Sequence, residues 1–266
     1  MGFLHRFFVR LIIRTRIKTN KSGGSAAANS IANAAQVYLK NNFGKDELNV
    51  FGQIERIREE LNRSAEEISM RDYGAGIRGK QSGDSKSKFV TVIRKLGRLN
   101  KRSAKPEAWS RFIYSLIREL KPSSSLELGT CTGITSMYIA AAKKNSGGRL
   151  ITIEGDITLS SLARLSFQKL GFDNIDLITG NFDDVLPEIL HNGNKFDFVF
   201  VDGNHREEPT LRYFEMISPY MNPGGVILFD DISWSKEMRS AWSRITASER
   251  VGFSADLYEM GICLLN

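Results

Sequence analysis

The sequence predicts an α/β fold in which a mostly parallel sheet is covered by helices on both faces. Three observations carry this prediction. Strand-like and helix-like segments alternate from residue 124 to residue 247, a glycine turn joins the first strand to its helix at Gly129 and Gly133, and two strand-like runs close the sequence as a hairpin. Such alternation is typical of parallel sheets, because their crossover helices pack on both faces.

The expected sheet begins after a segment that ends at Lys121-Pro122. We expect strands at 124–129, 149–154, 174–179, 196–202 and 225–230, and helices at 134–144, 157–170, 183–191, 207–220 and 236–247. The runs 251–259 and 261–265 are predicted to form the hairpin, with an antiparallel last strand. The chain therefore contains one sheet of about seven strands.

Length and composition place the chain among ordinary globular proteins. It has 266 residues, of which 41% are hydrophobic and 25% are charged, which fits one α/β domain with an extension. Two cysteines, Cys131 and Cys263, make no disulfide framework, so a reducing, cytoplasmic setting is expected. No apolar run approaches the roughly 18 residues of a membrane-spanning helix.

The charge is divided unevenly between the two parts of the chain. Residues 1–105 hold 22 Lys and Arg against 9 Asp and Glu, whereas residues 106–266 hold 15 against 21. This asymmetry suggests separate functional parts. We expect a basic amphipathic segment at 1–21, a helical extension or lid at 22–105, and a cofactor-binding domain at 106–266.

The first 21 residues contain six basic residues and no acid. Apolar and arginine side chains recur every four residues, which on a helix gives a broad apolar face and an arginine stripe. Such a helix can lie on an anionic membrane surface, as a peripheral contact at the inner face of the membrane. Packing against the rest of the protein or a partner, and disorder, remain open alternatives.

The extension is predicted to be mainly helical. Helices are expected at 26–42 and 50–62, a turn at 71–76, a polar segment at 79–88 and a short basic helix at 89–99. Pro106 stands at the favoured first turn of the next helix, which runs to about residue 120. Any lid over the sheet must come from this region or from loops, with Tyr73, the Gly74–Gly76 turn and Trp234 as candidates.

The most informative stretch is Glu127-Leu128-Gly129-Thr130-Cys131-Thr132-Gly133. A strand, a glycine turn and a helix start form a nucleotide-binding device, because backbone N–H groups face the crevice. The middle glycine of the dinucleotide fingerprint is replaced by Cys131. An acid before the turn suits a cationic ligand without phosphates, such as S-adenosylmethionine.

These seven residues resemble motif I of class I S-adenosylmethionine-dependent methyltransferases, especially the catechol-type and macrolide-sugar-type O-methyltransferases. The resemblance covers about residues 122–266 and implies a Rossmann-like fold. It implies cofactor-binding roles for Glu127, Gly129, Thr130 and Gly133 in this sequence.

Further cofactor contacts are expected at the ends of the next strands. Glu154 follows the second strand, where an acid can accept both ribose hydroxyls. In the resembling family the residue after the third strand reads the adenine, which implies that role for Asn181, with Phe182 against the ring. Loop capping is the other interpretation of Asn181.

Carboxylates end the fourth and fifth strands: Asp202 follows one, and Asp230 and Asp231 follow the other. Neighbouring carboxylates repel one another unless a cation neutralises them, and oxygen ligands without paired His or Cys suit Mg²⁺, Mn²⁺ or Ca²⁺. The resembling metal-dependent enzymes hold their metal at these strand ends. The sequence thus predicts Mg²⁺ or another divalent cation on these three residues, with helix capping by Asp230 or Asp231 as the alternative.

His205 lies three residues after Asp202, an offset at which the resembling enzymes place a Lys or His general base. A neutral imidazole can accept a hydroxyl proton near pH 7. His205 and Asp202 are therefore the predicted catalytic residues of an O-methyltransferase that acts on a small molecule or glycan, and Asp202 is also expected to contact the cofactor. A helix-capping loop histidine is the competing interpretation.

Two other functions are weighed against this one. The basic N-terminal part suggests an RNA or protein methyltransferase, but the Asn/Asp-Pro-Pro-aromatic motif of base N-methylation is replaced by Asp202-Gly203-Asn204-His205. A nucleic-acid partner is therefore not expected. A cofactor-binding protein without catalysis is the third reading, and homo-oligomer formation stays open.

Overall fold

The computed structural model describes residues 2–17, 25–73, 89–144 and 146–266. Its centre is a seven-stranded sheet with the order β5-β4-β3-β6-β7-β9-β8. The strands are β3 (Ser124–Leu128), β4 (Arg149–Glu154), β5 (Ile175–Thr179), β6 (Phe196–Val201), β7 (Met221–Phe229), β8 (Val251–Asp256) and β9 (Gly261–Leu265). Neighbours from β5 to β7 are parallel, and β9 is antiparallel to both β7 and β8. The predicted sheet, its hairpin and its antiparallel strand are confirmed.

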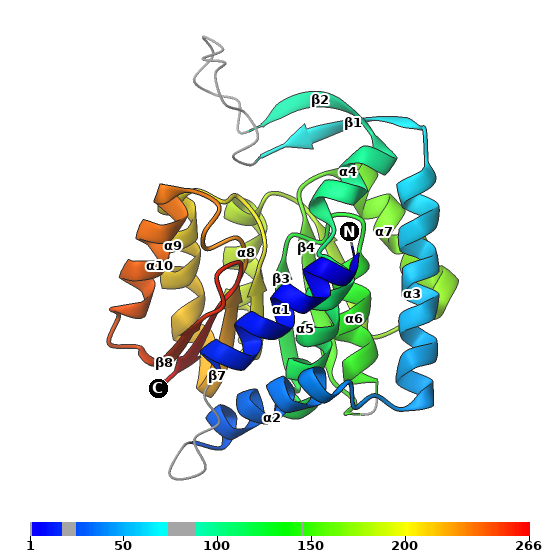
Figure 1. Cartoon of the computed structure of the whole chain (residues 1–266). Helices are drawn as coiled ribbons and strands as arrows, with labels where there is room; N and C mark the ends of the chain where they lie inside the picture. The colour runs from blue at the N-terminus through cyan, green and yellow to red at the C-terminus, as the bar shows by residue number, and fades with distance from the viewer. Residues whose placement is uncertain (1, 18–24, 74–88, 145) are drawn as a thin grey trace.

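Helices cover both faces of this sheet (Figure 1). In chain order, the described helices are α1 (Gly2–Arg16), α2 (Ala26–Lys40), α3 (Lys45–Arg63), α4 (Leu96–Ser103), α5 (Glu107–Leu120), α6 (Ile134–Lys143), α7 (Ile157–Leu170), α8 (Phe182–His191), α9 (Glu207–Ile217) and α10 (Lys236–Thr246). A short 3₁₀ turn, Ser218–Tyr220, follows α9. None of the described helices is long and apolar enough to cross a membrane.

Alternation along β6 divides the interior into two apolar cores. Phe198 and Phe200 pack with residues of α2, α3, α5 and α6, whereas Val199 and Val201 pack with α8, α9 and α10. Successive side chains of a strand point to opposite faces of a sheet, so an uninterrupted apolar strand must be buried on both sides. This burial explains the run of four apolar residues before Asp202.

The N-terminal extension shares the first core. Val9 and Ile13 of α1, Ile31 of α2 and Phe51 of α3 are buried together with the helices of the sheet. Figure 1 shows α1 crossing the front of the molecule, α2 running along its base and α3 standing beside α6 and α7. Hydrophobic burial between these elements therefore ties the extension to the sheet.

The prediction of a helix at 89–99 is wrong. Val90–Lys95 is strand β2, which pairs antiparallel with β1 (Glu67–Asp72), and helix α4 begins at Leu96. The run Val90-Thr91-Val92-Ile93 is rich in β-branched residues, which favour strands. The predicted turn at 71–76 is wrong for Arg71 and Asp72, which belong to β1. Its Gly74–Gly76 part and the polar segment 79–88 lie outside the described residues.

Candidate active site

A crevice of about 540 Å³ opens at the carboxyl edge of the sheet, where ligands bind in open α/β folds. The end of β1, the α4–α5 connection and the loops after five strands form its walls. The lining side chains that matter for chemistry are Tyr73, Arg102, Lys105, Gly129, Cys131, Glu154, Asn181, Phe182, Asp202, His205, Asp230, Asp231, Trp234 and Glu259.

The glycine loop after β3 forms the floor of the crevice. Gly129 has a φ of +105°, and a Cβ there would overlap the backbone carbonyl of Asp202, so this position requires glycine. The backbone N–H of Cys131 donates to Glu154 Oε2 at 2.7 Å. Gly133 faces the side chains of Phe167 and Ala163 on α7, so its close approach is to a helix.

Two residues of the predicted cofactor set lie behind this loop. Glu127 is fully buried, and its Oε2 accepts hydrogen bonds from Ser136 Oγ and, at 2.7 Å, from Thr152 Oγ1. Thr130 is also buried, and its hydroxyl lies 2.6 Å from that of Thr152. Neither Glu127, Thr130 nor Gly133 is among the residues that line the crevice.

Glu154, by contrast, lines the crevice at the end of β4. Its carboxylate accepts from the backbone N–H groups of Cys131 and Asp156, the latter at 2.9 Å. Burial nevertheless raises the pKa of Glu154 to about 7. This acid is thus held by the backbone and available at the carboxyl end of its strand.

The hairpin of β1 and β2 reaches over this end of the crevice. The backbone N–H of Arg71 donates to Asp156 Oδ2 at 2.7 Å, and Thr158 Oγ1 donates to the carbonyl of Ser69 at 3.2 Å. A Cβ at Gly155 would stand 2.8 Å from the Tyr73 ring. Both Tyr73 and Trp234, two of the predicted lid residues, line the crevice.

Asn181 and Phe182 begin α8 beside Glu154. Asn181 is the N-cap residue, and its side chain accepts from the backbone N–H of Asp183 at 3.5 Å. The Phe182 ring packs edge-on against Tyr213, with 5.8 Å between ring centroids. Asn181 therefore caps the helix and also lines the crevice.

Asp202, His205 and Asp230 meet at the opposite end of the crevice. One potential ligand atom from each of the three lies within 4.8 Å of the others, and His205 Nε2 lies 3.6 Å from Asp202 Oδ1. Burial and the Asp230 carboxylate raise the pKa of Asp202 well above its usual range. Apart from one ion pair, the two buried side-chain oxygens of Asp230 receive no hydrogen bond from the described part of the chain.

Asp231, the third predicted metal ligand, stands beside this group and is not one of the three. Its Oδ2 lies 3.9 Å from His205 Nε2, and its backbone has a φ of +52°. Burial and the charge of Asp230 raise the pKa of Asp231. The converging group therefore contains His205 in place of Asp231, next to Asp202 and Asp230.

Lys105 is the residue of this site that sequence reasoning missed. Its ammonium forms an ion pair with Asp230 Oδ2 and lies 3.6 Å from Asp231 Oδ1. Although burial disfavours the ammonium, the charges of Asp230, Asp202 and Asp231 raise the pKa of Lys105 above its usual value. A lysine 125 residues before Asp230 in the chain carries no signal in the sequence that it will meet that carboxylate.

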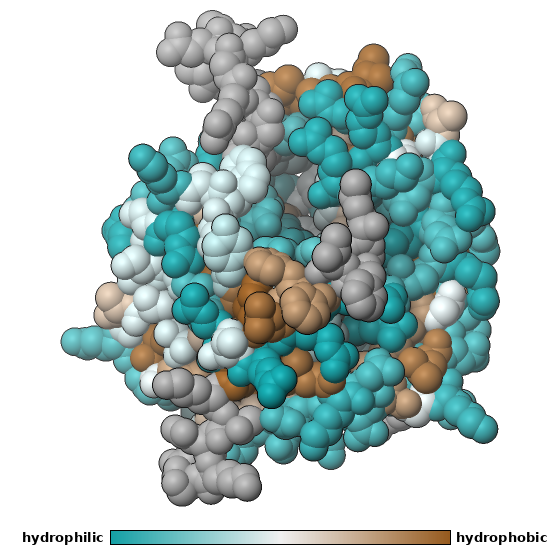
Figure 2. All heavy atoms as spheres, viewed as in Figure 1, coloured by the Kyte–Doolittle hydropathy of each residue, from teal (hydrophilic) through white to brown (hydrophobic). Residues whose placement is uncertain are grey.

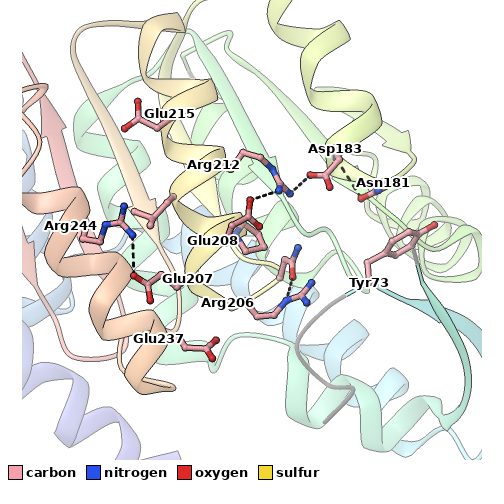
Figure 3. A pocket seen from close by; sticks show the side chains of 13 residues that line it. Tyr73, Asn181, Asp183, Arg206, Glu207, Glu208, Arg212, Glu215, Glu237 and Arg244 are labelled. Carbon is pink, nitrogen blue, oxygen red and sulfur yellow. Dashed lines mark hydrogen bonds and ion pairs between the residues drawn. The ribbon is translucent and has the colours of Figure 1, made fainter. Parts of the chain in front are cut away.

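A second hollow of about 860 Å³ adjoins the crevice near Asn181 and Asn204. Figure 3 shows Arg212 reaching both Asp183 and Glu208, and Arg244 turned toward Glu207. Arg212 and Arg244 on this wall are thus paired with acidic side chains of the same wall.

Comparison with known proteins agrees with this geometry. Residues 126–232 match a methyltransferase domain family. A catechol O-methyltransferase from Niastella koreensis is 29% identical over 124 residues, which are 46% of this chain and 55% of that protein. A transmembrane O-methyltransferase homolog from Mus musculus is 30% identical over 128 residues, 46% of this chain and 48% of that protein. The matches thus span about half the length of these relatives.

Solved structures share the fold. An O-methyltransferase from Bacillus cereus in complex with SAH has a TM-score of 0.54 at 24% identity, and the match covers 64% of this chain and 85% of that one. The O-methyltransferase TomG from Streptomyces achromogenes, in complex with SAM, has a TM-score of 0.55 at 22% identity, with 62% and 82% covered. The match of residues 126–232 to a methyltransferase domain family thus confirms the resemblance to class I S-adenosylmethionine-dependent O-methyltransferases that was predicted from Glu127–Gly133.

Proposed function

We propose that the protein is an S-adenosylmethionine-dependent O-methyltransferase that acts on a hydroxyl group of a small molecule or glycan. One observation carries the proposal: an imidazole and two strand-end carboxylates, His205, Asp202 and Asp230, share a crevice with the glycine loop and Glu154. A proton acceptor next to a methyl-donor site is what transfer to a hydroxyl requires.

The cofactor would lie along the end of the crevice formed by the loops after β3, β4 and β5. Glu154 would accept the ribose hydroxyls, and Asn181 and Phe182 would contact the adenine. Gly129 leaves the loop backbone close to the ligand, because no side chain stands there. Glu127, Thr130 and Gly133 support the loop from behind, through the hydrogen bonds and helix packing described above.

His205 would act as the general base. Its Nε2 lies 3.6 Å from Asp202 Oδ1 and 3.9 Å from Asp231 Oδ2, so nearby carboxylates would stabilise the imidazolium that forms when it accepts the hydroxyl proton. The substrate oxygen could then attack the sulfonium methyl group in line. Holding both reactants in one crevice supplies much of the rate enhancement.

A divalent cation fits the carboxylate end of the crevice. Apart from the Lys105 ammonium, no hydrogen-bond donor among the described residues reaches the buried side-chain oxygens of Asp230, and carboxylate oxygens are the ligands that Mg²⁺ prefers. Asp202 and Asp230 would hold the ion, with Asp231 beside them. When bound, such an ion lowers the pKa of a coordinated hydroxyl.

A membrane surface is a further proposed partner, through α1. One face of this helix is buried against the protein through Val9 and Ile13, while Phe7 and Leu11 remain 62% and 49% exposed. Figure 2 shows apolar side chains gathered at the centre of this face of the molecule, over α1. Exposed Arg14 and Arg16 beside them would favour anionic lipid.

The decisive experiment combines cofactor binding with methyl transfer. Calorimetry should detect binding of S-adenosylhomocysteine, and labelled S-adenosylmethionine should methylate members of a panel of catechols and sugars. We expect His205→Gln to lower kcat by roughly 10²–10⁴-fold, the usual contribution of a general base, with little change in S-adenosylhomocysteine affinity. Asp202→Ala should abolish transfer and retain that binding.

His191→Gln is the matched control, because His191 is exposed at the end of α8, away from the crevice. Wild-type protein that does not bind S-adenosylhomocysteine would overturn the proposal. Full activity of His205→Gln would remove the base assignment alone. Loss of Mn²⁺ binding in that variant would instead make His205 a metal ligand.

A further inference from the structure

Lys105 reaches into the site from outside the methyltransferase domain match. It lies in the short connection between α4, which ends at Ser103, and α5, which begins at Glu107. Its backbone carbonyl accepts a hydrogen bond from Ser110 Oγ at 3.2 Å, which holds the connection against α5. Only 10% of its side chain is exposed, and the side chain lines the crevice.

The ammonium of Lys105 is held by charge. It forms an ion pair with Asp230 Oδ2 and lies 3.6 Å from Asp231 Oδ1. Among the ion pairs of the described residues, no other Lys or Arg contacts Asp202, Asp230 or Asp231. One ammonium faces three carboxylates, so the cluster retains an excess of negative charge that a divalent cation can neutralise.

The ammonium and a divalent ion would nevertheless need the same carboxylate, that of Asp230. Asp230 Oδ2 contacts Lys105 Nζ, and Asp230 is also one of the three residues whose potential ligand atoms converge. Two cations held on one carboxylate repel each other strongly in a buried site. The Lys105 ion pair and a bound divalent ion therefore exclude each other on Asp230, and the ion can bind only if Lys105 moves away.

We propose that Lys105 is a tethered cation that competes with the divalent ion for Asp230. It holds Asp230 and Asp231 together when no divalent ion is bound, and it leaves Asp230 when one binds. This inference rests on the divalent-cation site of the proposed function. The flexible four-carbon stem of lysine makes the movement feasible, and the crevice of about 540 Å³, which Lys105 itself lines, provides the space.

The competition can be measured without turnover. Mn²⁺ binding to the full chain is followed by the loss of the free-ion signal in electron paramagnetic resonance. Lys105→Met should tighten Mn²⁺ binding at least tenfold, because the competing charge is gone. In chelator the same variant should melt at a lower temperature than wild type, since its carboxylates lack a counter-ion, and Mn²⁺ should raise its Tm more than it raises that of wild type.

Lys101→Met is the matched control, because Lys101 lies on α4 with an exposed side chain. Its Mn²⁺ affinity and Tm should equal those of wild type. Lys105→Gln removes the charge but keeps a hydrogen-bond donor. If Lys105→Met does not fold, the Mn²⁺ affinity of Lys105→Gln tests the competition instead. S-adenosylhomocysteine binding verifies that each variant is folded.

The possible failures are distinguishable. Equal Mn²⁺ affinity in wild type, Lys105→Met and Lys105→Gln would overturn the competition and leave the metal site intact. Absence of Mn²⁺ binding in wild type and in both variants, with S-adenosylhomocysteine still bound, would overturn the divalent-cation site and this inference with it. Tighter binding in the uncharged variants alone supports the inference.

Discussion

Glu127 belongs to the motif that first indicated the cofactor, yet its carboxylate is enclosed by protein. Its Oε2 accepts two hydroxyl hydrogen bonds, while its Oε1 has no partner among the described residues. Burial is the main cause that raises the pKa of Glu127 to about 7. A buried carboxylate with one unpartnered oxygen is costly to ionise, so Glu127 supports the glycine loop at some expense in stability.

This cost predicts an unusual pH dependence. The folded pKa of about 7 exceeds the ordinary value of 4.5, so the stability associated with protonated Glu127 is present below pH 4.5 and is lost as pH rises toward 7. Glu127→Gln should remove that loss and raise the free energy of unfolding at pH 8 by about 1–3 kcal/mol. Urea unfolding at pH 5 and pH 8 measures the difference.

Glu188→Gln, at an exposed position on α8, serves as the control and should change neither value. If Glu127→Gln is less stable than wild type at pH 8, the carboxylate is ionised and stabilising, contrary to this account. S-adenosylhomocysteine affinity should be retained in Glu127→Gln, because Glu127 does not line the crevice.

Among the secondary-structure elements, α1 shows the intramolecular packing that its sequence allowed and leaves part of its apolar surface exposed. Val9, Ile12, Ile13 and Ile17 are buried in the shared core, and Arg6 pairs with Glu107 of α5. The intramolecular packing is therefore present in the described structure. Phe7, Phe8 and Leu11 are left exposed on the same helix, so this packing does not use the whole apolar surface.

Vesicle binding tests the exposed side of α1. The double variant Phe7→Ser/Leu11→Ser should reduce sedimentation with anionic vesicles by roughly tenfold or more, given about 1.5–3 kcal/mol for a fully buried large apolar side chain and the partial burial expected here. Added salt should weaken wild-type binding, because the arginine contribution is screened.

Leu165→Ser is a suitable control for that variant, since Leu165 is 62% exposed on α7. It should sediment as wild type does. Equal sedimentation of the double variant and wild type would show that the exposed side of α1 does not bind the vesicles. If wild type itself does not bind anionic vesicles, the proposed membrane contact is wrong.

At the scale of the whole molecule, the extension and the sheet share one core. Phe51 of α3 is fully buried, with its ring centroid 4.7 Å from that of Tyr114 on α5 and 5.2 Å from that of Tyr138 on α6. Tyr138 also donates to Glu55 of α3 at 2.9 Å. The proposed boundary at residue 105 thus divides the sequence, but the segments on its two sides bury their apolar side chains in one core.

Cooperative unfolding is the expected consequence. Phe51→Ala should lower the free energy of unfolding by about 3–5 kcal/mol, the usual cost of removing a buried aromatic side chain. Tryptophan fluorescence, which includes buried Trp109 on α5, and circular dichroism should shift together.

Leu48→Ala, on the same helix but 41% exposed, should cost less than about 1 kcal/mol. A separate early transition in Phe51→Ala, with the main transition unshifted, would mean that the extension unfolds independently of the sheet.

The sequence by itself determined the sheet, most helix boundaries and the strand-end acids. Strand and helix periodicities are local, and residues that end parallel strands necessarily meet at one edge of the sheet. This is why Glu154, Asp202 and Asp230 could be assigned to one crevice. The β-branched run at 90–93 also favours a strand. Its pairing partner β1 ends at Asp72, before the intervening residues 74–88, so the pairing is not evident from the local sequence.

Only the tertiary structure decided which predicted residues face the crevice and which stand behind it. Glu127 and Glu154 are both strand acids, but one is enclosed by hydroxyls and the other lines the cavity. Lys105 reached Asp230 only because α4 and α5 fold over the sheet edge. Burial and pairing of charges depend on long-range packing, so the electrostatic character of the site was not available from local patterns.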